Sequence, residues 1–129
     1  MEPTTPGVSN GEALPSTDQA ALDRLKRFGG GKLLGEMISL FLSTAPERIA
    51  AARAGLDAAD AAATEMALHS LKSSAAQLGA MRMQRLSERG ELLARAGTLT
   101  DVPALMQELD NEFPRVQTWL ERARNTETA

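Results

Sequence analysis

The chain has 129 residues, a net charge of −3 at pH 7, one histidine, no tyrosine and no cysteine. This length supports one domain with one hydrophobic core, and the lack of cysteine excludes disulfides and Cys-ligated metal sites. A single histidine excludes multi-His metal sites, and the acidic balance with no long basic run argues against broad nucleic-acid binding. We therefore expect one domain with no metal and no nucleic-acid partner.

Residues 1–15 combine several prolines and glycines with few large apolar side chains, a composition typical of disordered segments. They also lack the basic-then-apolar pattern of a secretory signal. We predict a disordered lead on a cytoplasmic protein. The lead and the initiating Met1 favour a free-standing protein or a terminal fragment.

From Ser16 onward the sequence is rich in Ala, Leu, Met, Arg and Glu, all of which favour helix. No stretch alternates strictly between polar and apolar residues, as a half-buried strand does. A short first helix is predicted after an N-cap at Ser16 or Thr17, and it ends at the glycines 29–31. Its apolar face consists of Leu22, Leu25 and Phe28.

A second helix is predicted from about Lys32 to Leu56, because apolar residues recur there at steps of three and four. Pro46 lies inside it, and a mid-helix proline loses a hydrogen bond, so we expect a kink or a break. The longest apolar stretch, Met37 to Leu42, is too short to cross a membrane, and no membrane contact is expected. The apolar stripe of this helix is Leu34, Ile38, Phe41, Ala45, Ile49 and Leu56.

Three more helices follow. Asp60 can cap a third helix that ends at Gly79, a left-handed stop position, and a fourth runs from about Met81 to Ala96 and ends at Gly97. A fifth starts near Asp101 and carries two prolines, of which Pro114 should bend it. Its apolar stripe is Val102, Met106, Leu109, Phe113, Val116 and Leu120.

These elements predict an all-α fold, an antiparallel four-helix bundle with the short first helix as a lid. The bundle is expected to span residues 16–124. Residues 125–129 are expected to form a disordered tail.

The predicted third helix turns His69 away from the core. At 100° per residue, one arc collects the apolar seam of Thr64, Leu68, Leu71, Ala75 and Leu78. His69 points roughly 140° from the centre of that arc. Lys72 lies three residues on, so its ammonium can reach a phosphoryl group on the ring. A lone surface histidine is usually inert, so this spacing permits a phosphoacceptor without requiring one.

The segment from Ala67 to Ala80 reads ALHSLKSSAAQLGA. It resembles the signature of bacterial histidine phosphotransfer (HPt) domains, approximately A-H-x-L-K-G-S-A-x-x-L-G-A. Outside the segment, Asp60, the stretch from Leu33 to Ile49 and the acidic Glu91 are also similar to the family pattern. The resemblance covers roughly residues 18–119 and implies the same four-helix bundle.

The resemblance also implies a role for each matching residue. His69 would accept the phosphoryl group as a phosphoramidate, Lys72 would hold its oxygens, and Gly79 would end the helix. Ser73 stands where the family usually has glycine after the lysine, which narrows the clearance for a partner and puts the transfer rate in question. The implied docking face comprises Ala62, Glu65, Ser73, Ala76 and Gln77.

The implied function is that of a phosphocarrier rather than an enzyme. It would shuttle a phosphoryl group between receiver-domain aspartates in a multistep phosphorelay. Its partners would be receiver domains of response regulators or hybrid sensor kinases, and the protein itself would be a monomer without a cofactor, since magnesium is expected on the receiver. Two alternatives stay open: a non-phosphorylated helical adaptor on the same bundle, and an HPt module cut from a hybrid or chemotaxis kinase.

Overall fold

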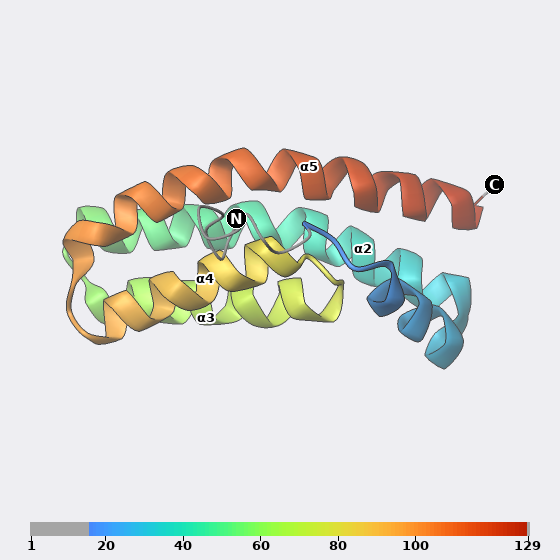
Figure 1. Cartoon of the computed structure of the whole chain (residues 1–129), viewed down its shortest axis with the longest axis horizontal. Helices are drawn as coiled ribbons and strands as arrows, with labels where there is room; N and C mark the ends of the chain where they lie inside the picture. The colour runs from blue at the N-terminus through green and yellow to red at the C-terminus, as the bar shows by residue number, and fades with distance from the viewer. Residues whose placement is uncertain (1–15, 129) are drawn as a thin grey trace, which may run out of the picture.

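The computed structural model describes residues 16–128, which fold into an antiparallel bundle of helices (Figure 1). No strand occurs in this described part, and the predicted all-α bundle is confirmed. The predicted lead, residues 1–15, and Ala129 lie outside the described residues. The helices are α2 (Gln19–Asp57), α3 (Ala61–Gln77), α4 (Met81–Arg95) and α5 (Val102–Thr128), with one 3-10 turn, η1 (Leu99–Asp101), before α5.

The first two predicted helices follow each other within α2 and meet at a kink at Gly30, among the glycines 29–31 where the first was predicted to end. This residue has φ 77° and ψ −179°, a backbone conformation that favours glycine because it has no Cβ. Figure 1 shows the part before the bend, in blue, turned out from the longer part at the end of the bundle where α5 terminates. This segment packs through its first half, where Ala21 and Leu22 are buried, and Phe28, predicted to lie on its apolar face, is 88% exposed.

The N-cap of this segment is Asp18, not Ser16 or its neighbour as predicted. The Asp18 carboxylate accepts a hydrogen bond from a first-turn amide at 3.1 Å. Ser16 is used elsewhere: its carbonyl accepts a hydrogen bond from the amide of Met81 at 3.0 Å, and its hydroxyl donates to Glu112. The chain before α2 therefore caps the N-terminus of α4, where no side chain does so.

The two prolines inside long helices do not divide them. Every residue of α2 except Gly30 keeps helical dihedral angles, Pro46 included, so of the kink or break predicted at Pro46 the break is absent. The proline ring fixes φ near −65°, a helical value, so the helix loses one backbone hydrogen bond and continues. Likewise, α5 runs through Pro114 and is bowed rather than broken (Figure 1).

The predicted disordered tail is wrong for residues 125–128, because α5 extends to Thr128. Lys26 Nζ lies 3.0 Å from Glu127 Oε2. This ion pair connects the last turn of α5 to the segment before the Gly30 bend. The local sequence pattern does not predict it, because the two residues are far apart in the chain.

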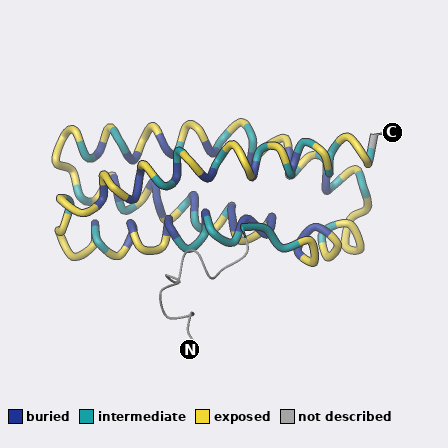
Figure 2. The backbone as a smooth tube through the Cα atoms, turned by 45° about the horizontal axis from the view of Figure 1, so that its top comes forward, coloured by how far each residue is buried: buried dark blue, intermediate teal, exposed yellow. Residues whose placement is uncertain are grey.

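The core lies between the helices, and the predicted apolar stripes supply it (Figure 2). The seam of α3 is buried throughout, and the stripe of α5 is buried except for Phe113, which packs partly buried against the core. The ring centroids of Phe41 on α2 and Phe113 on α5 lie 6.3 Å apart. The interior faces of the four helices are therefore the faces that periodicity selects.

Gly79 fixes the turn between α3 and α4. It has φ 74°, and its carbonyl accepts a hydrogen bond from the amide of Asp18 at 2.8 Å. A Cβ at this position would lie 2.5 Å from the carbonyl oxygen of Asp18. The turn thus has no room for a side chain, and it sets how α4 returns along α3.

Replacing Gly79 with alanine should destabilise the fold through two effects. The left-handed backbone costs about 1–2 kcal/mol, and crowding against Asp18 adds about 1–3 kcal/mol. Gly97→Ala is the matched control, because Gly97 has φ 78° and an added Cβ would meet nothing within 4 Å. Urea unfolding followed by circular dichroism measures both variants, and equal losses of stability in the two would contradict this account.

Candidate functional site

His69 lies in the middle of α3, on the side away from the core. The carboxylate of Asp60 accepts a hydrogen bond from the amide of Ala63 at 3.0 Å and so caps the start of the helix. Leu68 and Leu71 face inward and are fully buried. His69 follows Leu68 directly and points outward, with 59% of its side chain exposed.

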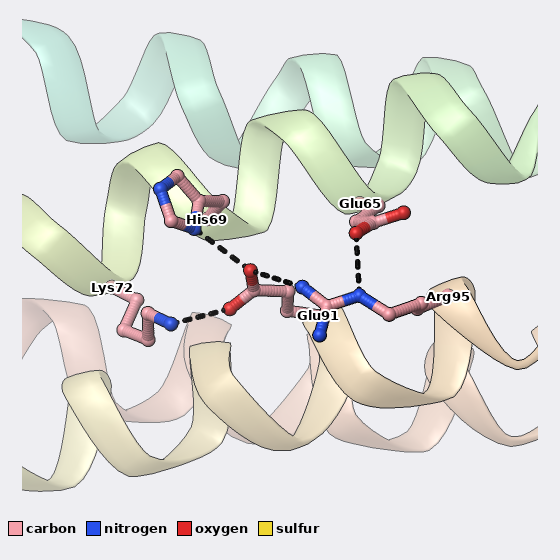
Figure 3. A network of polar contacts seen from close by, with 5 residues as sticks. All are labelled: Glu65, His69, Lys72, Glu91 and Arg95. Atoms are coloured by element: carbon pink, nitrogen blue, oxygen red, sulfur yellow. Dashed lines mark hydrogen bonds and ion pairs between the residues drawn. The ribbon is translucent and has the colours of Figure 1, made fainter.

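Glu91 of α4 is the group around which the site is built (Figure 3). Its side chain is only 2% exposed, and its Oε2 lies 2.7 Å from His69 Nδ1. Its other oxygen, Oε1, lies 2.7 Å from Lys72 Nζ. Gly90 precedes it, and a Cβ there would lie 2.7 Å from Leu68 Cδ1. Because Gly90 has no side chain, α4 can approach α3 closely enough for Glu91 to reach the ring.

Arg95, one turn after Glu91 on α4, brings a further cation to the same carboxylate. Its Nη2 lies 3.0 Å from Glu91 Oε2, and its Nε lies 2.8 Å from Glu65 Oε2 on α3. The planar guanidinium presents several donors in a fixed fork, so it can bind two carboxylates at once. The hydrogen bond that it donates to Glu65 raises the pKa of Arg95.

Glu91 is ionised despite its burial. Burial alone would raise its pKa, but hydrogen bonds from Lys72 and His69, together with their charges, outweigh that effect and hold the pKa below its usual value. Glu91 is therefore a carboxylate at neutral pH, which accepts a hydrogen bond from His69 and forms an ion pair with Lys72.

This pairing decides which nitrogen of His69 is available. A carboxylate can only accept a hydrogen bond, so Nδ1 carries the ring hydrogen, and in the neutral ring Nε2 bears the lone pair. Figure 3 shows the second ring nitrogen turned away from Glu91. The ring is thus oriented by a buried partner, while its other nitrogen faces away from that partner.

Most of the predicted docking face is exposed. Glu65 is the exception, since it is half-buried and bonded to Arg95, and it belongs to the polar network. Met66, which lies outside the predicted docking face, is 71% exposed one turn before His69. The exposed members of the predicted face are Ala62, Ser73, Ala76 and Gln77.

Lys72, predicted to lie within reach of a phosphoryl group on the ring, is paired with Glu91. Its side chain is 26% exposed, and its ammonium is bonded to Glu91. To bind a phosphoryl group on His69, the Lys72 ammonium would have to contact both that group and Glu91, or give up its contact with Glu91.

Sequence reasoning missed Glu91 and Arg95 as site residues. Glu91 matched the family pattern, but the periodicity of one helix does not say which face of α4 meets α3. Their spacing of four residues was the available signal. Alone, that spacing is typical of a solvated helix face.

The family model described as Hpt domain matches residues 36–124. The chain belongs to the Hpt family. The fold is similar to the crystal structure of histidine-containing phosphotransfer protein B (HptB) from Pseudomonas aeruginosa PAO1, with a TM-score of 0.82 and 27% sequence identity over 87% of this chain and 96% of that chain. No curated protein sequence matches the chain significantly.

The described residues of this Hpt protein contain neither a membrane-spanning helix nor a metal-binding cluster. Among them, no helix has the length and apolar character that crossing a membrane requires. Within the same residues, no group of three or more His, Asp or Glu side chains is arranged to hold a metal ion.

Acid should weaken the fold through Glu91. Its folded-state pKa lies below the ordinary value of 4.5, so the stability from its pairs is complete above that value and is lost as the pH falls through the lower folded-state pKa. At neutral pH we expect wild type to exceed Glu91→Gln in free energy of unfolding by about 1.5–3 kcal/mol, the range for hydrogen bonds to charged groups. In urea titrations at stepwise lower pH, this difference should shrink.

The matched control is Glu88→Gln, because Glu88 is an exposed glutamate on the same helix and forms no ion pair with the described residues. It should differ little from wild type at any pH. A stability difference for Glu91→Gln that stayed constant into acid would show that the buried carboxylate is not held ionised by its partners.

Proposed function

We propose that this Hpt protein is a phosphocarrier in a multistep phosphorelay. His69 takes a phosphoryl group from the aspartate of one receiver domain and gives it to another. The observation that supports this most is the exposed imidazole on α3, whose Nδ1 is bonded to a buried carboxylate 2.7 Å away. The family match and the likeness to HptB support the same function.

In the transfer, the lone pair on His69 Nε2 attacks the phosphorus of the aspartyl phosphate. The P–O bond to the aspartate breaks, and the aspartate leaves as a carboxylate. The ring keeps its hydrogen on Nδ1 and gains positive charge, which Glu91 stabilises from 2.7 Å. Transfer to the next receiver reverses these steps, and both directions need the in-line approach that an exposed nitrogen allows.

Lys72 is proposed to stabilise the phosphoryl oxygens, since a cation three residues from His69 on the same helix is within reach of them. No cofactor is proposed for this chain, because magnesium is expected on the receiver. We therefore propose a carrier that acts only together with a receiver or kinase, not an enzyme in its own right.

The proposed receiver docks on the exposed face of α3 around His69. Small side chains at Ala62 and Ala76 let a partner approach the ring closely, and Ser73 fills part of the space that the family's usual glycine leaves. Met66 adds exposed apolar surface one turn from the ring. The partners would be receivers of response regulators or hybrid kinases, and the carrier would be monomeric and cytoplasmic.

A labelled phosphoryl group should appear on His69 alone. We expect wild type to remove label from a panel of phosphorylated receiver domains, and to hold it in an acid-labile, alkali-stable form, as a phosphoramidate does. His69→Gln should accept none. Label on the His69→Gln protein would contradict the proposal, and a wild type that accepts none from any receiver or from phosphoramidate would favour a non-phosphorylated adaptor.

Ser73→Arg separates docking from chemistry in the same assay. The side chain is exposed, so the variant should fold normally, yet a long arginine would obstruct a receiver. Phosphoramidate, a small donor that needs no docking face, should still label His69 in this variant. Transfer from receivers at the wild-type rate would place the docking face elsewhere.

A further inference from the structure

The position of Lys72 poses a problem for phosphoryl transfer. Its ammonium nitrogen lies 2.7 Å from Glu91 Oε1, whereas the phosphoryl group would be attached to the ring nitrogen that faces away from Glu91. If Lys72 turns toward the phosphoryl group, Glu91 loses a cation while remaining 2% exposed. The phosphorylated ring is positive beside Oε2 of Glu91, but Oε1 loses its cation, and a buried carboxylate that loses a cation is destabilised, so this movement needs compensation.

Arg95 is placed to provide it. Its Nη2 lies 3.0 Å from Glu91 Oε2, the oxygen that Lys72 does not use. Arg95 and Glu91 are one turn apart on the same helix, so their contact does not depend on movement between α3 and α4. The second contact of Arg95, from Nε to Glu65 Oε2 at 2.8 Å, holds the guanidinium in place from α3.

The charges of this network balance before phosphorylation. Glu65 and Glu91 supply two negative charges, and Lys72 and Arg95 supply two positive ones. A phosphoryl group brings roughly 1.5 to 2 negative charges, and the positive charge that the ring gains offsets only one of them, so the phosphoryl oxygens still attract a cation. Lys72 is the member that can move more easily, since it has a flexible stem and one ion-pair partner among residues 16–128, whereas Arg95 contacts two carboxylates.

We infer that Arg95 is a positioning residue: it keeps Glu91 paired while Lys72 turns from Glu91 to the phosphoryl oxygens. The inference rests on the proposed function of His69 and deepens it. Glu65 takes part indirectly, because it binds the Arg95 guanidinium, which in turn binds Glu91. Without Arg95, the buried carboxylate would retain Lys72, and the phosphoryl group would lose its cation.

The test is a double-mutant cycle on the rate of phosphoryl transfer from a labelled receiver. Lys72→Ala and Arg95→Ala should each slow transfer. We expect a loss of about 10- to 100-fold for Arg95→Ala, the range found when a residue that orients a functional side chain is replaced. The double variant should be no slower than Lys72→Ala, because Arg95 acts through Lys72. Arg95→Lys, which keeps the charge at Glu91, should recover part of the rate.

Arg89→Ala is the matched control, because Arg89 is an exposed arginine on α4 with no ion pair among residues 16–128. It removes the same charge without touching Glu91, and its transfer rate should equal that of wild type. A second readout is the NMR signal of the Lys72 ammonium. It should shift on phosphorylation of wild type by phosphoramidate and stay in place in Arg95→Ala.

Two results would overturn the inference. Wild-type transfer by Arg95→Ala would show that Lys72 needs no help, and multiplicative losses in the double variant would show that Arg95 acts independently of Lys72. A wild-type protein that takes no label on His69 would instead reject the proposed function itself, so the two failures are distinguishable.

Discussion

The contact between His69 Nδ1 and the buried carboxylate of Glu91 is the interaction on which the rest of the site depends. It holds the ring hydrogen on the inner nitrogen, so the outer nitrogen keeps its lone pair. It also explains why cations gather beside an exposed histidine, since a carboxylate that is 2% exposed needs pairing. Lys72 and Arg95 supply that pairing from two helices.

The bundle is built so that this contact can form. Gly90 allows α4 to pack against Leu68 of α3 without an intervening side chain, and Glu91 follows it directly. Gly79 makes the turn that returns α4 along α3. Ser16 caps the start of α4 through its carbonyl, so the chain before α2 helps to hold the two helices in register.

The helices and their buried faces could be predicted because each depends on residues close in sequence. His69 is exposed because it directly follows the buried Leu68, and successive residues of a helix point about 100° apart. The end of α3 near Gly79 follows from the left-handed backbone that glycine favours. The network around Glu91 could not be predicted in this way, because it depends on how α4 is rotated against α3. The helical C-terminal residues 125–128 were not predicted either, because their contact with the start of the bundle joins residues far apart in sequence. Lys26 there forms an ion pair with Glu127.

Nitrogen-15 NMR of the His69 ring tests the central claim most directly, because the chain has one histidine and its ring signals need no assignment by mutagenesis. The account predicts that the neutral form of the ring carries its hydrogen on Nδ1, and that this preference is lost when Glu91 is replaced by alanine. A wild-type ring that carries its hydrogen on Nε2 would contradict the account, since the outward nitrogen would then have no lone pair to accept a phosphoryl group.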